Sequence, residues 1–351
     1  LDPVGHDHFS PSVCSRWGAV ARRSWHVEDD LLRARPPRYR GLDIWSSAFV
    51  QAQWSSTRFR LTGGARADHW TLTNDVRASP WALGEIAIGA GLTLRAAASI
   101  HHQAPDFPHV VGPAAGTNLA VERAYHADIG VEQAIGRSGR WRVTMYNREE
   151  RDRLRLWASE PRLFGPDDVI GRSSTGPWQT AVDGYARGVE FLLQRRSARG
   201  PSGWISYSFA RNHYRDRVLR DAFDGDFDQR HTLNAFGAWR LTGRTSVAVR
   251  LRVGSNTPAT GYFEERDGLV YVGRERNRLR VPYYSRLDLR ASRMFTVGRS
   301  RLTFFVELMN ALGRDNVRFT TPNIDFQTRT ARNLFEPLLP RLPSAGLTIE
   351  F

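Results

Sequence analysis

The sequence predicts an all-β chain, and three of its features lead to that prediction. From about residue 45 onward, apolar and charged side chains alternate with a period of two, the period of a strand whose faces meet different surroundings. No segment of comparable length shows the 3.6-residue period of an amphipathic helix. The links between the alternating segments are short and long in turn.

The alternation is clearest in the second half of the chain. Val247, Val249 and Leu251 share one parity. Arg250 and Arg252 share the other, so this segment has one apolar and one charged face. Applied along the chain, the same pattern predicts strands, in order, at 45–53, 57–66, 78–87, 92–102, 123–135, 140–157, 184–196, 202–214, 230–241, 244–256, 284–296, 300–311 and 342–351.

The connections indicate what kind of sheet these strands form. The long ones, rich in Pro, Asp, Asn and Gly, are 67–77, 103–122, 158–183, 215–229, 257–283 and 312–341. A soluble β-sandwich has no reason to lengthen every second connection, whereas a transmembrane barrel has tight periplasmic turns and long outer loops. The sequence therefore predicts an antiparallel transmembrane β-barrel in the bacterial outer membrane, with about 13 or 14 strands present.

The distribution of aromatic and charged residues fits the same environment. Aromatic residues near the short turns are typical of the girdle at a membrane interface. They are Trp54, Phe59, Trp141, Trp204, Trp239, Phe295 and Phe351. On the other parity, charged side chains would line a wet interior as ion-pair networks. These predicted lumen-facing charges are Arg240, Arg250, Arg252, Arg286, Asp288, Arg290, Arg301 and Glu307.

The composition excludes several other classes of protein. The 351 residues carry 50 Lys+Arg, all of them arginine, against 36 Asp+Glu, for a net charge of +14. The arginines are scattered among carboxylates and form no nucleic-acid-binding motif, so we expect no nucleic-acid partner. Cys14 is the single cysteine, which excludes an intrachain disulfide. No run of about 18 apolar residues is present, which excludes a transmembrane helix.

Several segments resemble, in order, the C-terminal part of the barrel of TonB-dependent outer-membrane receptors. They are 102–105 (HQAP), 121–124 (VERA), 184–191 (GYARGVEF), 203–210 (GWISYSFA), 227–234 (FDQRHTLN), 284–290 (YSRLDLR), 306–312 (VELMNAL) and 346–351 (GLTIEF). The resemblance covers about 45–351. It implies uptake of a scarce ligand such as an iron chelate, cobalamin or an oligosaccharide, captured by the long loops and driven by the proton gradient through TonB.

The C-terminus carries the sharpest part of the resemblance. Ser344, Gly346, Ile349 and Phe351 match the polar-x-Gly-x-x-apolar-x-apolar pattern that outer-membrane barrels present to the barrel-assembly machinery. Physically, this is an amphipathic last strand with an aromatic end, which can pair at an open sheet edge before the barrel closes. We therefore expect outer-membrane lipid and the assembly machinery as partners.

The sequence also departs from the family. Members of that family have a barrel of about 22 strands, filled by an N-terminal plug that contacts TonB. Residues 1–44 resemble neither the plug nor its TonB box. We expect 1–44 to be an extracellular loop or one further strand, for which Trp17–Leu32 is the candidate, and 45–351 to be the barrel. The chain is then a fragment without its plug, unable to perform active transport alone. The alternative is a complete passive porin of about 14 strands.

An enzyme is not predicted. His101, His102, Asp228 and His231 lack the spacing of a metal site or catalytic triad, and no nucleotide or zinc motif occurs. We expect no catalytic residue, no metal and no cofactor. The ligand-binding residues are expected in the loops 103–122, 158–183, 215–229, 257–283 and 312–341, although the sequence does not identify which of them face a ligand.

Overall fold

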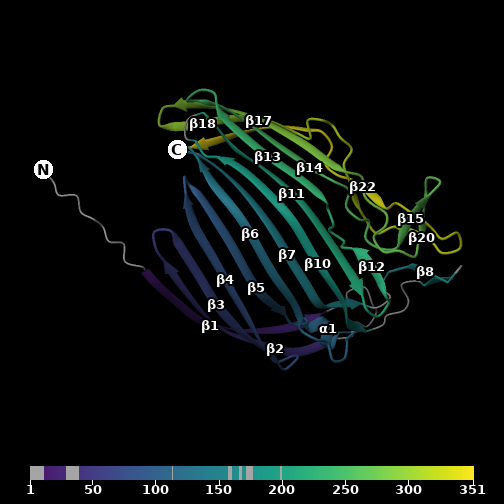
Figure 1. The fold of residues 1–351 in the computed structure, drawn as a ribbon. Helices are drawn as coiled ribbons and strands as arrows, with labels where there is room; N and C mark the ends of the chain where they lie inside the picture. Colours follow the sequence, from purple (N-terminus) through teal and green to yellow (C-terminus); the bar gives the residue numbers. More distant parts are fainter. Residues whose placement is uncertain are drawn as a thin grey trace.

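The computed structural model of the chain describes residues 12–28, 39–112, 114–156, 160–165, 168–170, 177–197 and 200–351. One antiparallel sheet of 15 strands dominates it, and 14 of these strands follow one another in a single path (Figure 1). They are β1 (Ser12–Glu28), β2 (Tyr39–Ser55), β3 (Phe59–Trp70), β4 (Asp75–Gly89), β5 (Leu92–Gln103), β6 (Glu122–Ile135), β7 (Gly139–Leu156), β10 (Trp178–Arg195), β11 (Pro201–Asp216), β13 (His231–Arg240), β14 (Thr245–Gly254), β17 (Tyr284–Val297), β18 (Ser300–Met309) and β23 (Leu342–Glu350).

The all-β antiparallel prediction is confirmed, and each predicted strand has a counterpart in the path. The predicted long connection 67–77 is wrong, because β3 and β4 are joined only by residues 71–74. Its polar residues belong to the sheet: Asp68 accepts hydrogen bonds from Trp45 Nε1 at 3.0 Å and Arg66 Nε at 2.8 Å. Likewise, residues 178–183 of the predicted loop 158–183 are the first residues of β10.

The two edges of the sheet lie at the ends of the path. β1 overlaps the candidate strand Trp17–Leu32, and β2 already begins at Tyr39. Within the described residues, β1 pairs only with β2 and β23 pairs only with β18. The sheet is therefore an open arc (Figure 1), which weighs against a complete 14-stranded porin.

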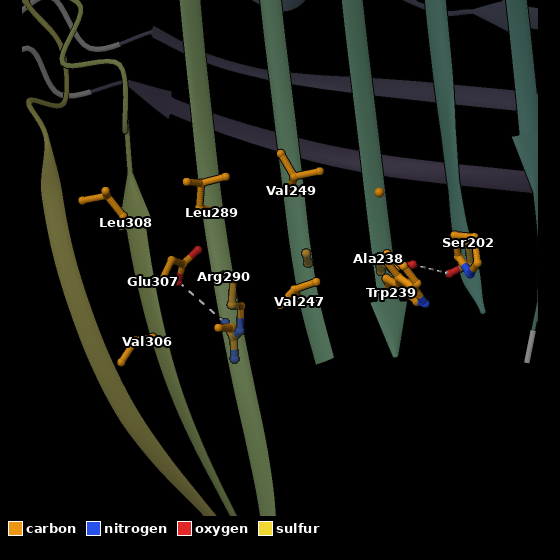
Figure 2. A pocket seen from close by; sticks show the side chains of 14 residues that line it. Ser202, Ala238, Trp239, Val247, Val249, Leu289, Arg290, Val306, Glu307 and Leu308 are labelled. Carbon is orange, nitrogen blue, oxygen red and sulfur yellow. Dashed lines mark hydrogen bonds and ion pairs between the residues drawn. The ribbon is translucent and has the colours of Figure 1, made fainter. Parts of the chain in front are cut away.

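Strand register separates two faces of the sheet. On the apolar face, Val249 opposes Leu289, Leu289 opposes Leu308, and Val306 opposes Ala345. Figure 2 shows Val249, Leu289 and Leu308 on three neighbouring strands, where they border a shallow apolar groove of about 590 Å³. The other face is the charged face. Register places all eight predicted lumen charges on it, namely Arg240, Arg250, Arg252, Arg286, Asp288, Arg290, Arg301 and Glu307.

The charged face carries ion pairs that cross strands. Glu85 on β4 binds Arg60 on β3 at 3.0 Å and Arg95 on β5 at 2.9 Å. Further along the sheet, Arg290 on β17 lies 3.6 Å from Glu307 on β18, and within β17 Arg286 lies 2.7 Å from Asp288. These contacts are the mixed networks that the alternation predicted.

The aromatic residues near the short turns divide between the faces. Register assigns five to the apolar face, namely Trp54, Phe59, Trp141, Trp239 and Phe295. The expectation for Trp204 is wrong, because it pairs with Gln194 and Phe236 on the charged face. Pro201 lies opposite Trp239 on the apolar face, and Trp204, three residues later in β11, therefore points to the other side of the sheet. Phe351 follows β23, and its side chain is fully exposed.

The long loops contain structure of their own. Their elements are α1 (Phe107–Val111), β8 (Arg162–Phe164), β9 (Asp168–Ile170), β12 (Asp221–Asp224), β15 (Phe263–Arg266), β16 (Leu269–Val272), β19 (Val317–Phe319), β20 (Asn323–Asp325), β21 (Thr330–Arg332) and β22 (Phe335–Pro337). β16 pairs with β21, so the loops 257–283 and 312–341 share one small sheet. Under that sheet lies the loop core, formed by Ala259, Phe263, Leu279, Val281, Ala331 and Leu334. No helix in the described part of the chain is long and apolar enough to span a membrane.

Gly346 in β23 is expected to tolerate no side chain. It pairs with Phe305 of β18 on the charged face, and a Cβ atom at position 346 would lie 2.5 Å from a carbon of the Phe305 ring. Gly346→Ala should therefore displace that ring and lower the free energy of unfolding by about 1–3 kcal/mol. Heat-modified gel mobility of the detergent-solubilised protein measures the change. Gly84→Ala is the control, since nothing lies within 4 Å of its Cβ position, and equal shifts for the two variants would contradict the prediction.

Candidate ligand-binding site

A cavity of about 350 Å³ opens at the long-loop end of the sheet. Strands β7, β10 and β11 contribute one part of its lining, and three long loops contribute the other. The strand residues are Arg153, Leu154, Arg155, Trp178, Val182, Asn212 and Tyr214. The loop residues are Glu160, Arg162, Phe223, Asp226, Phe227, Tyr262 and Arg276.

Irregular strand pairing turns the ends of β7 and β10 toward this cavity. The register of the pair shifts between Thr180 and Val182 and again between Val182 and Gly184. On β7, Asp152 has a φ of 61°, a backbone conformation that bends the strand. As a result Val182 comes to oppose Arg153, and both line the cavity.

Three of the four arginines in the lining have carboxylate partners. Arg153 lies 3.1 Å from Glu150, and Arg155 bonds to the buried Asp216. Arg276 binds Glu160 at 2.9 Å and Asp226 at 2.8 Å. Burial alone would lower the pKa of Arg276, but the hydrogen bonds and charges of these two carboxylates outweigh it and raise that pKa.

Arg162 differs from the other three. Arg162 is only 8% exposed, its Nε has no hydrogen-bond partner, and no carboxylate whose side chain the structure describes pairs with it. Its guanidinium lies 5.9 Å from the centre of the Tyr262 ring. Burial raises the pKa of Tyr262, so this hydroxyl stays neutral and cannot supply the missing negative charge. Arg162 therefore presents a buried cation to the cavity that it lines, and a negative group bound there could pair with it.

Aromatic rings complete the lining and pack against two of the arginines that have carboxylate partners. The Arg153 guanidinium lies 4.5 Å from the centre of the Tyr214 ring, and that of Arg276 lies 4.8 Å from the Phe223 ring. The Tyr214 hydroxyl donates a hydrogen bond to Glu150 at 3.1 Å. These contacts restrict the rotamers of the arginines, so the arginines would lose less conformational entropy when a ligand binds.

A buried carboxylate ties the neighbouring loops together behind the cavity. Asp228 accepts hydrogen bonds from Arg230 Nε at 2.6 Å and from an Arg280 guanidinium nitrogen at 2.9 Å. It also accepts the backbone N–H of Asn212 at 2.8 Å. The loop 215–229 is thereby fixed to the loop 257–283 and to β11. Asp228 has no part in a triad, because His231 instead contacts the Tyr207 hydroxyl at 2.8 Å.

Three of the five loops expected to bind a ligand meet at this cavity: 158–183, 215–229 and 257–283. The loop 103–122 contacts the back of the site, where the His109 ring lies 4.3 Å from that of Trp178. The loop 312–341 supplies no lining residue.

Sequence reasoning missed Arg153, Arg155 and Tyr214, because the period of two alone does not reveal the strand irregularities that turn them inward. Within the described residues, no cluster of three or more His, Cys, Asp or Glu side chains could hold a metal.

Comparisons with known proteins place this arrangement in a family. No curated protein matches the chain. A variant of the ferric enterobactin receptor from Pseudomonas aeruginosa, in complex with enterobactin, is 15% identical with a TM-score of 0.71, over 97% of this chain and 52% of that one. The copper transporter OprC is 15% identical with a TM-score of 0.65, over 96% and 53%. The outer membrane transporter YddB from Escherichia coli is 11% identical with a TM-score of 0.65, over 96% and 50%.

These TM-scores show a shared fold, and the chain spans about half the length of the solved structures that it matches. The family model described as "TonB dependent receptor-like, beta-barrel" matches residues 8–311. That match covers most of the chain and agrees with the strand order and the two-faced sheet. The chain belongs to the TonB-dependent receptor-like β-barrel family.

Proposed function

We propose that this chain is the barrel portion of a bacterial outer-membrane receptor that takes up a scarce, negatively charged small molecule such as an iron chelate. The observation that carries the proposal is the buried Arg162 in the wall of the long-loop cavity, whose Nε has no hydrogen-bond partner and which pairs with no carboxylate whose side chain the structure describes. A ferric chelate with acidic groups would satisfy this cation. Neutral oligosaccharides would leave it without a counter-charge, and cobalamin presents little anionic surface.

The proposed orientation follows from the two faces and the two ends of the sheet. The apolar face would meet lipid and the charged face the barrel interior, since hydrocarbon excludes exposed charges. The long loops would lie outside the cell and the short turns in the periplasm. Energy would enter through TonB and an N-terminal plug, which residues 1–44 do not resemble.

The C-terminal strand supports the same placement. Ser344 lies on the charged face opposite Glu307, and Ile349 lies on the apolar face opposite Leu302. With Gly346 and Phe351, they would form the signal that the barrel-assembly machinery recognises. A strand with one face of each kind at the sheet edge is suited to that recognition, because its free backbone groups can pair before closure.

Binding measurements on the Arg162→Gln variant test the proposal. Quenching of tryptophan fluorescence is titrated with ferric catecholate, ferric hydroxamate and ferric citrate chelates, and with cyanocobalamin and a neutral maltooligosaccharide. We expect one anionic chelate to bind, and Arg162→Gln to weaken it by about tenfold or more, since a charge-assisted hydrogen bond contributes about 1.5–3 kcal/mol. The fold should persist, because the structure describes no carboxylate that this substitution would leave unpaired.

The matched control is Arg278→Gln in the loop 257–283. Among the described residues Arg278 pairs with Glu275 alone, and its side chain is 61% exposed, so this substitution should leave the affinity unchanged. Equal binding by the wild type and Arg162→Gln would remove the cavity from the proposal. Preferential binding of the oligosaccharide or cyanocobalamin would overturn the anionic ligand class.

A further inference from the structure

A second group of arginines lies on the apolar face, outside the cavity just described. All are exposed. Arg187 lies in the middle of β10, and the others lie in the long-loop half of β6, β7 or β11 or in the turn that follows β11. We call this group the arginine rim; its members are Arg123, Arg151, Arg187, Arg211, Arg215, Arg217 and Arg220. The candidate ligand site uses none of them.

Strand register brings arginines of the rim directly opposite each other. Arg123 on β6 opposes Arg151 on β7, and Arg187 on β10 opposes Arg211 on β11. Like charges at opposed positions of an antiparallel pair repel each other and destabilise the sheet. Negative charge bound from outside the sheet would relieve the repulsion within both pairs.

The carboxylates of this surface do not supply enough negative charge to balance the arginine rim. Glu149 binds Arg187 at 2.6 Å and lies 3.7 Å from Arg151. Asp152 and Asp183 lie 3.1 and 3.6 Å from Arg217. Asp152 also lies 3.8 Å from Arg123, so within the described part of the chain these seven arginines pair with three carboxylates, which leaves an excess of four positive charges.

The rim also encloses space for a ligand group. A surface cavity of about 450 Å³ is bordered by Arg151, Arg215, Arg217 and Arg220. The Tyr185 ring forms part of its wall, with the Arg187 guanidinium 4.2 Å from the ring centre. Glu149, Asp183 and Asp216 border it as well, and Asp216 is already bonded to Arg155. The opening thus offers arginine donors to an anion of the size of a phosphate group.

Apolar residues lie further along the same strands, toward the short turns. Phe209 is two residues from Arg211, and Ile129 and Met145 are six residues from Arg123 and Arg151; their exposed fractions are 41%, 51% and 56%. The arginines therefore stand where the apolar face ends, with Tyr125 among them and the Arg123 guanidinium 5.3 Å from its ring. Basic residues at the border of a hydrocarbon-facing surface meet the headgroups of a membrane.

We infer that the arginine rim binds the phosphate groups of an anionic lipid in the outer leaflet, with the lipid's acyl chains against the apolar face below. This inference rests on the membrane orientation given under the proposed function. The excess of four positive charges matches a lipid that bears more than one phosphate. The apolar residues next to the rim favour a lipid over a free anion, which would gain nothing from them.

Native mass spectrometry of the full-length protein in detergent micelles tests the inference. The probe is bis-phosphorylated lipid A, and the double variant carries Arg187→Gln and Arg211→Gln. A basic residue near a lipid surface contributes about 1 kcal/mol, so we expect lipid retention to weaken by about thirtyfold. The pair Arg187→Lys and Arg211→Lys keeps both charges and should retain most of the binding.

The matched control is the pair Arg195→Gln and Arg293→Gln, which removes two exposed arginines from the same face at the short-turn end. It should leave retention unchanged. An equal loss in this pair, no loss in the first pair, or equal binding of lipid A without phosphates would each overturn the inference. Full displacement by inorganic pyrophosphate would assign the rim to a soluble anion instead. None of these measurements uses the transport ligand, so they are independent of the Arg162 test.

Discussion

Asp228→Ala is expected to release the two loops beside the cavity and to cost about 2–4 kcal/mol in local stability. The Asp228 side chain is buried, with 2% exposure, and two arginines and one backbone N–H depend on it. Removing one partner from a buried ion pair costs about 3–5 kcal/mol. We lower that figure because the side chains of Arg230 and Arg280 are 30% and 26% exposed, so water can solvate part of the charge left behind.

Hydrogen exchange of the loops 215–229 and 257–283 measures this effect. Their amides should exchange faster in Asp228→Ala, while those of β2 to β5 should not change. Glu275→Ala is the control, since Glu275 pairs with Arg278 and both side chains are more than 60% exposed. That substitution should stay within about 0.5 kcal/mol of the wild type. Unchanged loop exchange in Asp228→Ala would mean that other contacts hold these loops.

The second large effect is expected from Phe263→Ala in the loop core. Phe263 is 3% exposed, packs among the apolar residues of that core, and lies with its ring centre 6.0 Å from that of Phe319. Truncating a buried phenylalanine typically costs about 3–5 kcal/mol, because the apolar burial is lost and a cavity remains. The small sheet of β15, β16, β20 and β21 should therefore open while the 14-stranded path stays folded.

Limited trypsin digestion of the intact protein follows this opening, because the loops are rich in arginine. We expect cleavage between 264 and 332 to accelerate in Phe263→Ala. Leu269→Ala lies in the same small sheet with a 54% exposed side chain, and it should leave the cleavage rate unchanged. Similar rates in the two variants would show that the loop core does not hold the sheet together.

The sequence predicted the structure correctly in the segments whose residues alternate strictly between the two faces of the sheet. Alternation identified the strands and the charged face, since a residue's parity fixes which side of a sheet it occupies. It failed where that rule changes. Asp68 and His69 read as loop residues although β3 continues through them, and Trp204 lies on the face opposite to the one predicted. The short strands of the loops gave no signal, because three or four residues are too few to show a period.

The candidate site was predicted only as a set of loops. Arg162 has no local feature that distinguishes it from the other arginines of the chain; its burial results from the meeting of loops that are far apart in sequence. Arg153 and Arg155 reach the cavity through register shifts between β7 and β10. Such shifts depend on the pairing of two strands, so neither strand reveals them alone.

The separation of the loop 312–341 from the cavity also has an evolutionary consequence. The hairpin of β20 and β21 shares the loop core with the loop 257–283, yet no residue of 312–341 lines the cavity. Under the proposed function the long loops lie at the cell surface, where antibodies or bacteriophages would select for change in this hairpin. Substitutions at its exposed positions, Phe326 among them, could then accumulate while the arginines of the cavity stay the same. Escape from recognition and specificity for an anionic ligand would then fall on different stretches of the chain.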